Sequence, residues 1–263
     1  MRNSLIEKNS WSFLKEFTDA RIALGRTGVS LPTRELLEFS LAHAKAKDAV
    51  HQPFDKKMLE EQINETGLPI LKVSSAAKDR TVYLTRPDLG RQLSEESKKL
   101  LQSGNNPAVD VVIIIGDGLS SKAVHKQAFP LLKNLLPYIS QLDLSLAPIV
   151  LAEQSRVALG DEIGEILKAR LSVVLIGERP GLSSPDSLGV YMTWDPSVGK
   201  LDSERNCISN IRPEGLSYSK SAFKLAWLIE HALYLKATGI HLKDQSDNPS
   251  QYRIVKPDTF TIE

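Results

Sequence analysis

The sequence is poor in cysteine and in long apolar runs, and both shortages exclude classes of protein. Cys207 is the one cysteine in 263 residues, so an intrachain disulfide and a cysteine-based zinc site are both excluded. A single thiol is typical of the reducing cytoplasm rather than of a secreted domain. Residues 1–10 are polar and contain no apolar stretch of the length that an export signal or a membrane span requires. We therefore expect a cytoplasmic protein without a membrane partner.

An excess of charge of either sign is also missing. The chain has 33 lysines and arginines against 32 aspartates and glutamates, which gives a formal net charge of +1. Without a basic excess there is no overall field to attract nucleic acid or anionic lipid. We expect no nucleic-acid partner, whereas burial of the chain in a larger assembly is compatible with this balance.

Familiar catalytic motifs are absent as well. The sequence has no Gly-x-Ser-x-Gly elbow, no His-Glu-x-x-His pair and no phosphate-binding loop that ends in Gly-Lys-Ser/Thr. The histidines are scattered, and the spacing of His43, Asp48 and His51 places them on no single metal-binding face of a helix. We expect no catalytic side chain and no metal site, as in a subunit that binds a cofactor which performs the chemistry.

The first 107 residues have mainly helical periodicity. Helices are expected from Trp11 to about Gly25, from Thr33 as N-cap to Val50, over 55–66 and over 94–103, with a short extended piece at 81–84. A polar tail, residues 1–9, precedes them, and a polar turn at 104–107 marks a boundary. We interpret residues 1–107 as a smaller, mainly helical domain that docks a partner, because it has apolar helices but few chemical motifs.

Residues 108–263 alternate short apolar runs with helical periods, the pattern of a parallel sheet flanked by helices. The expected strands are 110–115, 147–152, 173–176, 190–193, 208–211 and 240–242. The clearest helices are 120–136, 161–170 and 219–237, and the polar residues after Asp244 are expected to fray. The predicted fold class is therefore α/β, with a mostly parallel, Rossmann-like sheet.

Two of these strands end in glycine turns. Residues 116–120 read Gly-Asp-Gly-Leu-Ser, and residues 176–182 read Ile-Gly-Glu-Arg-Pro-Gly-Leu. Parallel strands would bring both turns to the carboxyl edge of one sheet, where ligands of open α/β folds bind. Glycine turns let a ligand approach the backbone, but the need for a tight turn explains these glycines equally well. The third glycine and the ribose-binding acid of a dinucleotide site are both missing.

Two residues near this edge are ambiguous from position alone. Glu178 is either an acceptor for an amide-bearing ligand or, more plainly, the partner of Arg179 in an exposed ion pair. Cys207, as a lone cysteine, is more often a small buried hydrophobe than a nucleophile.

Several segments resemble the ethanolamine ammonia-lyase light chain, also called the small subunit. They are 17–26 (Phe-Thr-Asp-Ala-Arg-Ile-Ala-Leu-Gly-Arg), 41–44 (Leu-Ala-His-Ala), 116–120, 176–182 and 207–211 (Cys-Ile-Ser-Asn-Ile). They follow one another in order over nearly the whole chain, so chance agreement is implausible. The resemblance implies an adenosylcobalamin-dependent lyase that converts ethanolamine into acetaldehyde and ammonia by a radical route, together with a larger barrel-fold subunit that holds the substrate.

The same resemblance assigns cobalamin contacts to Val157, Glu178 and Cys207. Glu178 would accept hydrogen bonds from corrin amides, and the other two would supply apolar or backbone contact. No Asp-x-His-x-x-Gly motif is present, so the dimethylbenzimidazole of the cofactor is expected to stay on cobalt.

Two other functions stay open at this point. One is a stand-alone nucleotide-binding oxidoreductase, and the other is a non-catalytic assembly module that touches no cofactor. The resemblance further suggests a large complex of paired subunits with threefold symmetry. The sequence does not decide whether that complex lies inside a bacterial microcompartment.

Overall fold

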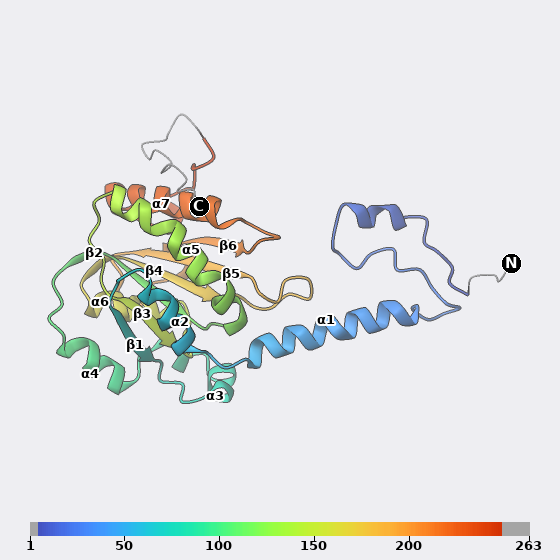
Figure 1. Cartoon of the computed structure of the whole chain (residues 1–263), viewed down its shortest axis with the longest axis horizontal. Helices are drawn as coiled ribbons and strands as arrows, with labels where there is room; N and C mark the ends of the chain where they lie inside the picture. The colour runs from blue at the N-terminus through green and yellow to red at the C-terminus, as the bar shows by residue number, and fades with distance from the viewer. Residues whose placement is uncertain (1–4, 249–263) are drawn as a thin grey trace.

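A six-stranded mixed sheet forms the centre of the computed structural model, which describes residues 5–248 (Figure 1). The strands are β1 (Ile70–Ser74), β2 (Val109–Gly116), β3 (Ile149–Glu153), β4 (Ala169–Gly177), β5 (Leu188–Trp194) and β6 (Arg205–Ile211), in the order β1-β3-β2-β4-β5-β6. The first four strands in this order are parallel, and β5 and β6 each run antiparallel to the strand before them in the order. The predicted α/β class with a mostly parallel sheet is confirmed.

Helices cover both faces of the sheet, which explains why its central strands are mainly apolar. On β2, Ile113 and Ile115 face the core beneath α5 (Ser121–Gln141) and α7 (Tyr218–Leu235). Val112 and Ile114 face a second core, toward α4 (Glu95–Ser103) and α6 (Leu159–Ile166). Alternate side chains of a strand point to opposite faces, so a strand buried on both sides has few polar positions; Ser172 of β4 is a buried exception.

The remaining helices of the body are α2 (Lys56–Asn64) and α3 (Arg80–Thr85). Most helix starts carry the side-chain caps that the sequence provides: Asp55, Asp79, Ser94, Ser120 and Ser217 each accept a hydrogen bond from a backbone N–H in the first turn. The predicted helices at 55–66, 94–103, 120–136 and 219–237 are confirmed, although α5 continues past its expected end to Gln141. The helix predicted at 161–170 is confirmed only in part, because α6 ends at Ile166 and residues 169–170 already belong to β4. Among residues 5–248, no helix has both the length and the apolar character needed to cross a membrane.

Four local predictions are wrong or incomplete. The extended piece at 81–84 is the helix α3, because Asp79 caps it through the Val82 N–H. The strand expected at 240–242 is a short 3-10 helix, Gly239–His241. The helix expected from Trp11 to Gly25 is a 3-10 helix over Ser12–Glu16 followed by irregular chain.

The fourth miss is β1, which was not predicted and which pairs with β3 at the edge of the sheet. Residues between α1 and β2 therefore pack on the α/β body rather than apart from it. Antiparallel pairing of β5 and β6 is likewise invisible in the local apolar pattern.

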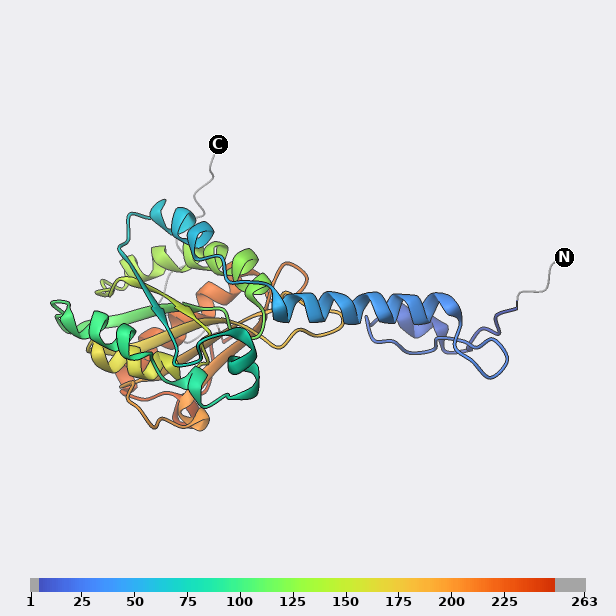
Figure 2. The same cartoon turned by 90° about the horizontal axis from the view of Figure 1, so that it is seen from below.

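An arm formed by residues 5–51 projects from this body (Figures 1 and 2). Its long helix, α1 (Thr33–His51), confirms the helix expected from Thr33, but Pro32 occupies the N-cap position and no side chain caps it. Large apolar side chains of the arm are exposed, including Leu37 at 63% and Leu41 at 55%. The expected tail at 1–9 and the expected fraying after Asp244 fall in part on residues 1–4 and 249–263, which lie outside the described residues.

Candidate functional site

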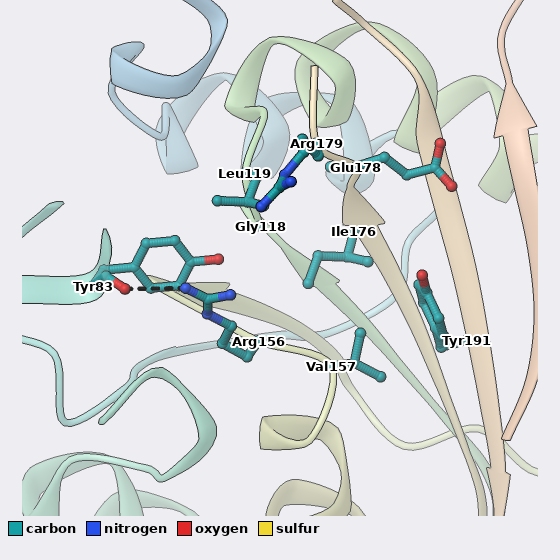
Figure 3. Close-up of a pocket in the computed structure, with 10 residues that line it drawn as sticks. Tyr83, Gly118, Leu119, Arg156, Val157, Ile176, Glu178, Arg179 and Tyr191 are labelled. Carbon is teal, nitrogen blue, oxygen red and sulfur yellow. Dashed lines mark hydrogen bonds between the residues drawn. The ribbon is translucent and has the colours of Figure 1, made fainter. Parts of the chain in front are cut away.

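A cavity of about 480 Å³ opens at the carboxyl edge of the sheet, where β2, β3 and β4 end (Figure 3). Its walls come from the turns that follow these three strands, from α3 and from β5: Tyr83, Gly118, Leu119, Arg156, Val157, Ile176, Gly177, Glu178, Arg179 and Tyr191. The cavity is open on one side rather than enclosed. The two glycine turns thus meet at one edge, as their sequence positions predicted.

Contact between the two turns accounts for their glycines. Gly118 has a φ of +55°, and a Cβ on it would lie 2.3 Å from the carbonyl oxygen of Gly177. A Cβ on Gly177 would lie 2.1 Å from the carbonyl oxygen of Ser120. The structure therefore favours the tight-turn explanation. The packing of the two turns against each other accounts for both glycines without a bound nucleotide.

A buried carboxylate supports the floor of the site. Asp117 accepts a hydrogen bond from the Ser155 N–H at 2.8 Å and lies 3.3 Å from Nη1 of Arg80. Burial raises the pKa of Asp117 to about 6, against the opposing effects of its hydrogen bonds and of Arg80. The same Nη1 donates to the Gly118 carbonyl at 2.8 Å, and Nε of Arg80 donates to the Val50 carbonyl at 2.7 Å. Arg80 therefore links the root of the arm to the cavity.

Tyr83 is in contact with two guanidinium groups. The central carbons of Arg80 and Arg156 lie 4.7 and 4.6 Å from the centre of its ring. Its hydroxyl donates to the Ser155 carbonyl at 3.1 Å, and its own carbonyl accepts from Nη2 of Arg156 at 3.2 Å. Burial raises the pKa of Tyr83 to about 12, so the phenol stays neutral. These contacts fix Arg156, yet its Nε is buried without a partner among the described residues.

Glu178 lies on the other side of the cavity from Arg156 (Figure 3). Its carboxylate accepts hydrogen bonds from the Ser187 hydroxyl and, at 3.4 Å, from the Asn210 N–H. The side chains of Glu178 and Arg179 point away from each other in Figure 3 and form no ion pair in the described part of the chain, so the predicted exposed ion pair between them is wrong. The carboxylate keeps acceptor positions for further hydrogen bonds.

Cys207 lies one strand beyond the cavity. It pairs across the β5–β6 ladder with Tyr191, whose ring lines the cavity. Loss of water around the thiol and the nearby Glu178 carboxylate raise its pKa, and a hydrogen bond with the Tyr191 hydroxyl opposes this rise. Cys207 is therefore a protonated thiol at neutral pH, which argues against a nucleophile. The expectation of a buried residue is wrong, because Cys207 is exposed.

The structure places both Val157 and Glu178 in the lining of one cavity and Cys207 behind Tyr191. Sequence reasoning missed Tyr83, Arg156 and Tyr191. Arg156 directly precedes Val157, and Tyr191 lies in a correctly predicted strand, so the sequence positions of both allowed them to be predicted as site residues. Tyr83 carried no signal, because its segment was expected to be extended. Within the described part of the chain, no cluster of histidine, cysteine and carboxylate side chains is arranged to hold a metal ion.

Comparison with known proteins agrees with the pattern of motifs. The family model described as "Ethanolamine ammonia-lyase light chain (EutC)" matches residues 8–243. The ethanolamine ammonia-lyase small subunit of Pseudomonas fluorescens is 52% identical over 242 residues, which cover 91% of this chain and 88% of that protein. The small subunit of Ralstonia nicotianae is 51% identical over 247 residues, covering 93% and 92%. That of Xanthomonas campestris pv. campestris is 49% identical over 245 residues, covering 92% and 90%.

Proposed function

The chain belongs to the ethanolamine ammonia-lyase light chain family, and from this membership and the cavity we propose that it binds adenosylcobalamin jointly with a large subunit. The assembled enzyme converts ethanolamine into acetaldehyde and ammonia. When bound, adenosylcobalamin supplies the radical chemistry of that reaction. We assign the complex to the cytoplasm, in keeping with the single cysteine.

The chemistry of the cavity walls fits a large ring that carries carboxamide groups. A carboxamide both donates and accepts hydrogen bonds, and the site offers the Glu178 carboxylate as acceptor and arginine N–H groups as donors. Val157 and Ile176 provide an apolar surface between them. The observation that carries the proposal is this combination of acceptor, donors and apolar surface at the carboxyl edge, where Rossmann-like folds bind ligands.

Each predicted contact then has a modest physical role. Glu178 accepts hydrogen bonds from amides of the ring, and its contacts with Ser187 and Asn210 hold the carboxylate in place. Val157 presents an apolar surface at the turn before α6. Cys207 acts as a small, uncharged group whose thiol orients Tyr191. None of these groups transfers a proton to or from the substrate, so the chain contributes binding and enclosure.

We assign the docking of the large subunit to the arm, residues 5–51, and to the open side of the cavity. Leu37 and Leu41 lie one turn apart on α1 and are more than half exposed. Exposed apolar surface of this extent is typical of an interface. The arm leaves the body beside the cavity, since Arg80 bonds both the Val50 carbonyl and the Gly118 carbonyl. A partner seated on the arm therefore also covers the site.

The decisive test follows the cobalt absorption spectrum while adenosylcobalamin and ethanolamine are added to this chain, to the large subunit and to both. We expect the radical-pair signal only with both chains. Glu178→Gln should weaken cofactor binding, whereas Glu165→Gln should not. Glu165 is a matched control, because it also accepts a backbone N–H, from Val198 at 3.1 Å, but at the opposite edge of the sheet.

Two outcomes would contradict the proposal. Activity or tight nucleotide binding by this chain alone would assign it a different function. Unchanged cobalamin affinity in a Glu178→Gln, Cys207→Ala double variant would make the chain an assembly module that leaves the cofactor to its partner.

A further inference from the structure

One wall of the cavity carries positive charge that no carboxylate of the described chain balances. Arg80 is paired with Asp117 beneath the site. Arg156 and Arg179 both line the cavity, and neither forms an ion pair within residues 5–248. The Glu178 carboxylate lies on the far side of the cavity, where it is engaged by Ser187 and Asn210 (Figure 3). The arginine side of the cavity is therefore suited to an anion.

The Arg156 guanidinium is held in place but is not satisfied. Stacking on Tyr83 at 4.6 Å and one hydrogen bond from Nη2 to the Tyr83 carbonyl fix its position. Its Nε is buried and has no hydrogen-bond partner in the described part of the chain. Buried donors in native structures nearly always have partners, and an unpaired donor on a cation is especially costly. The guanidinium lines the cavity and makes a single hydrogen bond within the described chain, so N–H groups of Arg156 remain for an acceptor that comes from outside.

The backbone next to Arg156 adds to this positive field. The helix α6 begins two residues after Val157, and no side chain caps its N-terminus. The positive end of a helix dipole favours an anion. The acids of its first turn are already paired elsewhere: Asp161 with Arg205, and Glu162 with Lys98 at 2.9 Å. They therefore leave the charge of Arg156 uncompensated.

Resting on the cobalamin function proposed above, we infer that Arg156, with Arg179 at the rim, binds the phosphodiester of the cobalamin nucleotide loop. The periphery of cobalamin consists mainly of neutral amides, and the phosphodiester is its fixed anion. A guanidinium offers parallel N–H groups that match two oxygens of a phosphate. Glu178 on one side and Arg156 on the other then give the cofactor a single orientation in the site.

The test compares two ligands that differ in one group: cobinamide, which lacks the nucleotide loop and its phosphate, and cobinamide phosphate. Dissociation constants are measured by absorption titration of the assembled complex with the large subunit. The wild-type complex should bind cobinamide phosphate about 10- to 100-fold more tightly than cobinamide, the range for hydrogen bonds to charged groups. Arg156→Met should reduce this ratio several-fold and leave only the part that Arg179 supplies, and Arg156→Lys should lose less.

Arg170→Met is the matched control. Arg170 also stacks on an aromatic ring, that of Trp194 at 5.4 Å, but it lies at the opposite end of β4 from Glu178. This variant should keep the wild-type ratio. Circular dichroism of each complex verifies folding. If Arg156→Met misfolds, the ratio of the two dissociation constants in Arg156→Lys is compared with that of the wild-type complex.

The outcomes distinguish a failure of the phosphodiester assignment from a failure of the proposed cobalamin function. A wild-type ratio in Arg156→Met would overturn the phosphodiester assignment while cobalamin binding stands. Failure of the wild-type complex to bind cobalamin at all would overturn the proposed function itself. Inorganic phosphate should compete with cobinamide phosphate and not with cobinamide. Phosphate that binds together with cobinamide phosphate would mean that the arginines hold a free anion, which also overturns the assignment.

Discussion

Arg80 and Asp117 form an ion pair at 3.3 Å in which the carboxylate side chain is only 2% exposed. This ion pair does not keep the pKa of Asp117 in its ordinary range. Loss of water around the carboxyl raises the pKa more than the charge of Arg80 and the backbone hydrogen bonds lower it. Asp117 lies directly beneath the glycine turn that lines the cavity, so its titration affects the stability of the site.

Asp117 should make the stability of the chain depend on pH. Its pKa is about 6 in the folded state against 3.8 for an unperturbed carboxyl, so the folded state binds the proton more tightly. The free energy of unfolding should therefore fall as pH rises from about 4 to about 6, by at most about 3 kcal/mol. Asp117→Asn removes this titration and should gain stability relative to wild type over that interval. Urea unfolding at several pH values checks this, with exposed Asp88→Asn as control. Parallel pH profiles for Asp117→Asn and wild type would contradict it.

Arg205 offers a comparison of buried and exposed ion pairs on one side chain. Asp161 pairs with it through two oxygens at 2.6 and 2.7 Å, with both side chains 2% exposed. Asp202 pairs with it at 3.4 Å but is 95% exposed. Asp161→Ala should destabilise the chain by about 3–5 kcal/mol, because it leaves a buried guanidinium without its partner. Asp202→Ala should cost less than about 1 kcal/mol. Denaturant unfolding measures both, and equal losses would refute the dependence on burial.

Cys207 should react slowly with alkylating agents despite being exposed. Loss of water around the thiol is the largest cause of its raised pKa, so the thiolate fraction near neutral pH is small. Glu178→Gln removes a carboxylate that raises this pKa and should speed alkylation. Tyr191→Phe removes a hydrogen bond that lowers it and should slow alkylation. Iodoacetamide kinetics across pH test the opposed directions, and a change of the same sign in both variants would disprove the assignment.

The arm should be needed for assembly and not for folding of the body. Deletion of residues 1–44 should leave the thermal unfolding midpoint unchanged, because it spares buried Ala49 and the Val50 carbonyl that Arg80 binds, and the main cores lie within the body. The same deletion should weaken association with the large subunit by at least about tenfold, as loss of an apolar anchor does. Analytical ultracentrifugation measures this association.

Point variants give a sharper version of the same test. The pair Leu37→Lys, Leu41→Lys should weaken assembly, whereas Val198→Lys, Leu201→Lys should not, although Val198 and Leu201 are exposed to a similar degree at the opposite edge of the sheet. Full assembly by the truncated chain would exclude the arm from the interface.

The interior of the sheet was predictable because its strands are short apolar runs. β2 and β4 are buried on both faces, and their valines and isoleucines admit no other interpretation next to the helices between them. β1 was missed because Lys72 interrupts a short strand at the sheet edge, and the apolar run is too brief to distinguish from a loop. The direction of β5 and β6 depends on pairing partners far along the chain, which no local pattern records.

The site was predictable only where it coincides with a strand end. Glu178 follows β4 directly, so its position at the sheet edge could be read from the sequence. Arg156 and Tyr83 are 73 residues apart in the sequence, and their contact exists only because β1 carries α3 to the end of β3. Val157 and Cys207 were reached through family resemblance, and their contact with cofactor stays a prediction.

The close contact of the two glycine turns has a consequence for genetics. The atoms that a methyl group at Gly118 or Gly177 would strike include backbone oxygens of the opposite turn, at 2.3 and 2.1 Å. A smaller side chain elsewhere cannot relieve a clash with backbone. A suppressor screen that starts from Gly177→Ala should therefore return true revertants rather than second-site replacements. Substitutions elsewhere in the chain should not compensate for a side chain at either glycine.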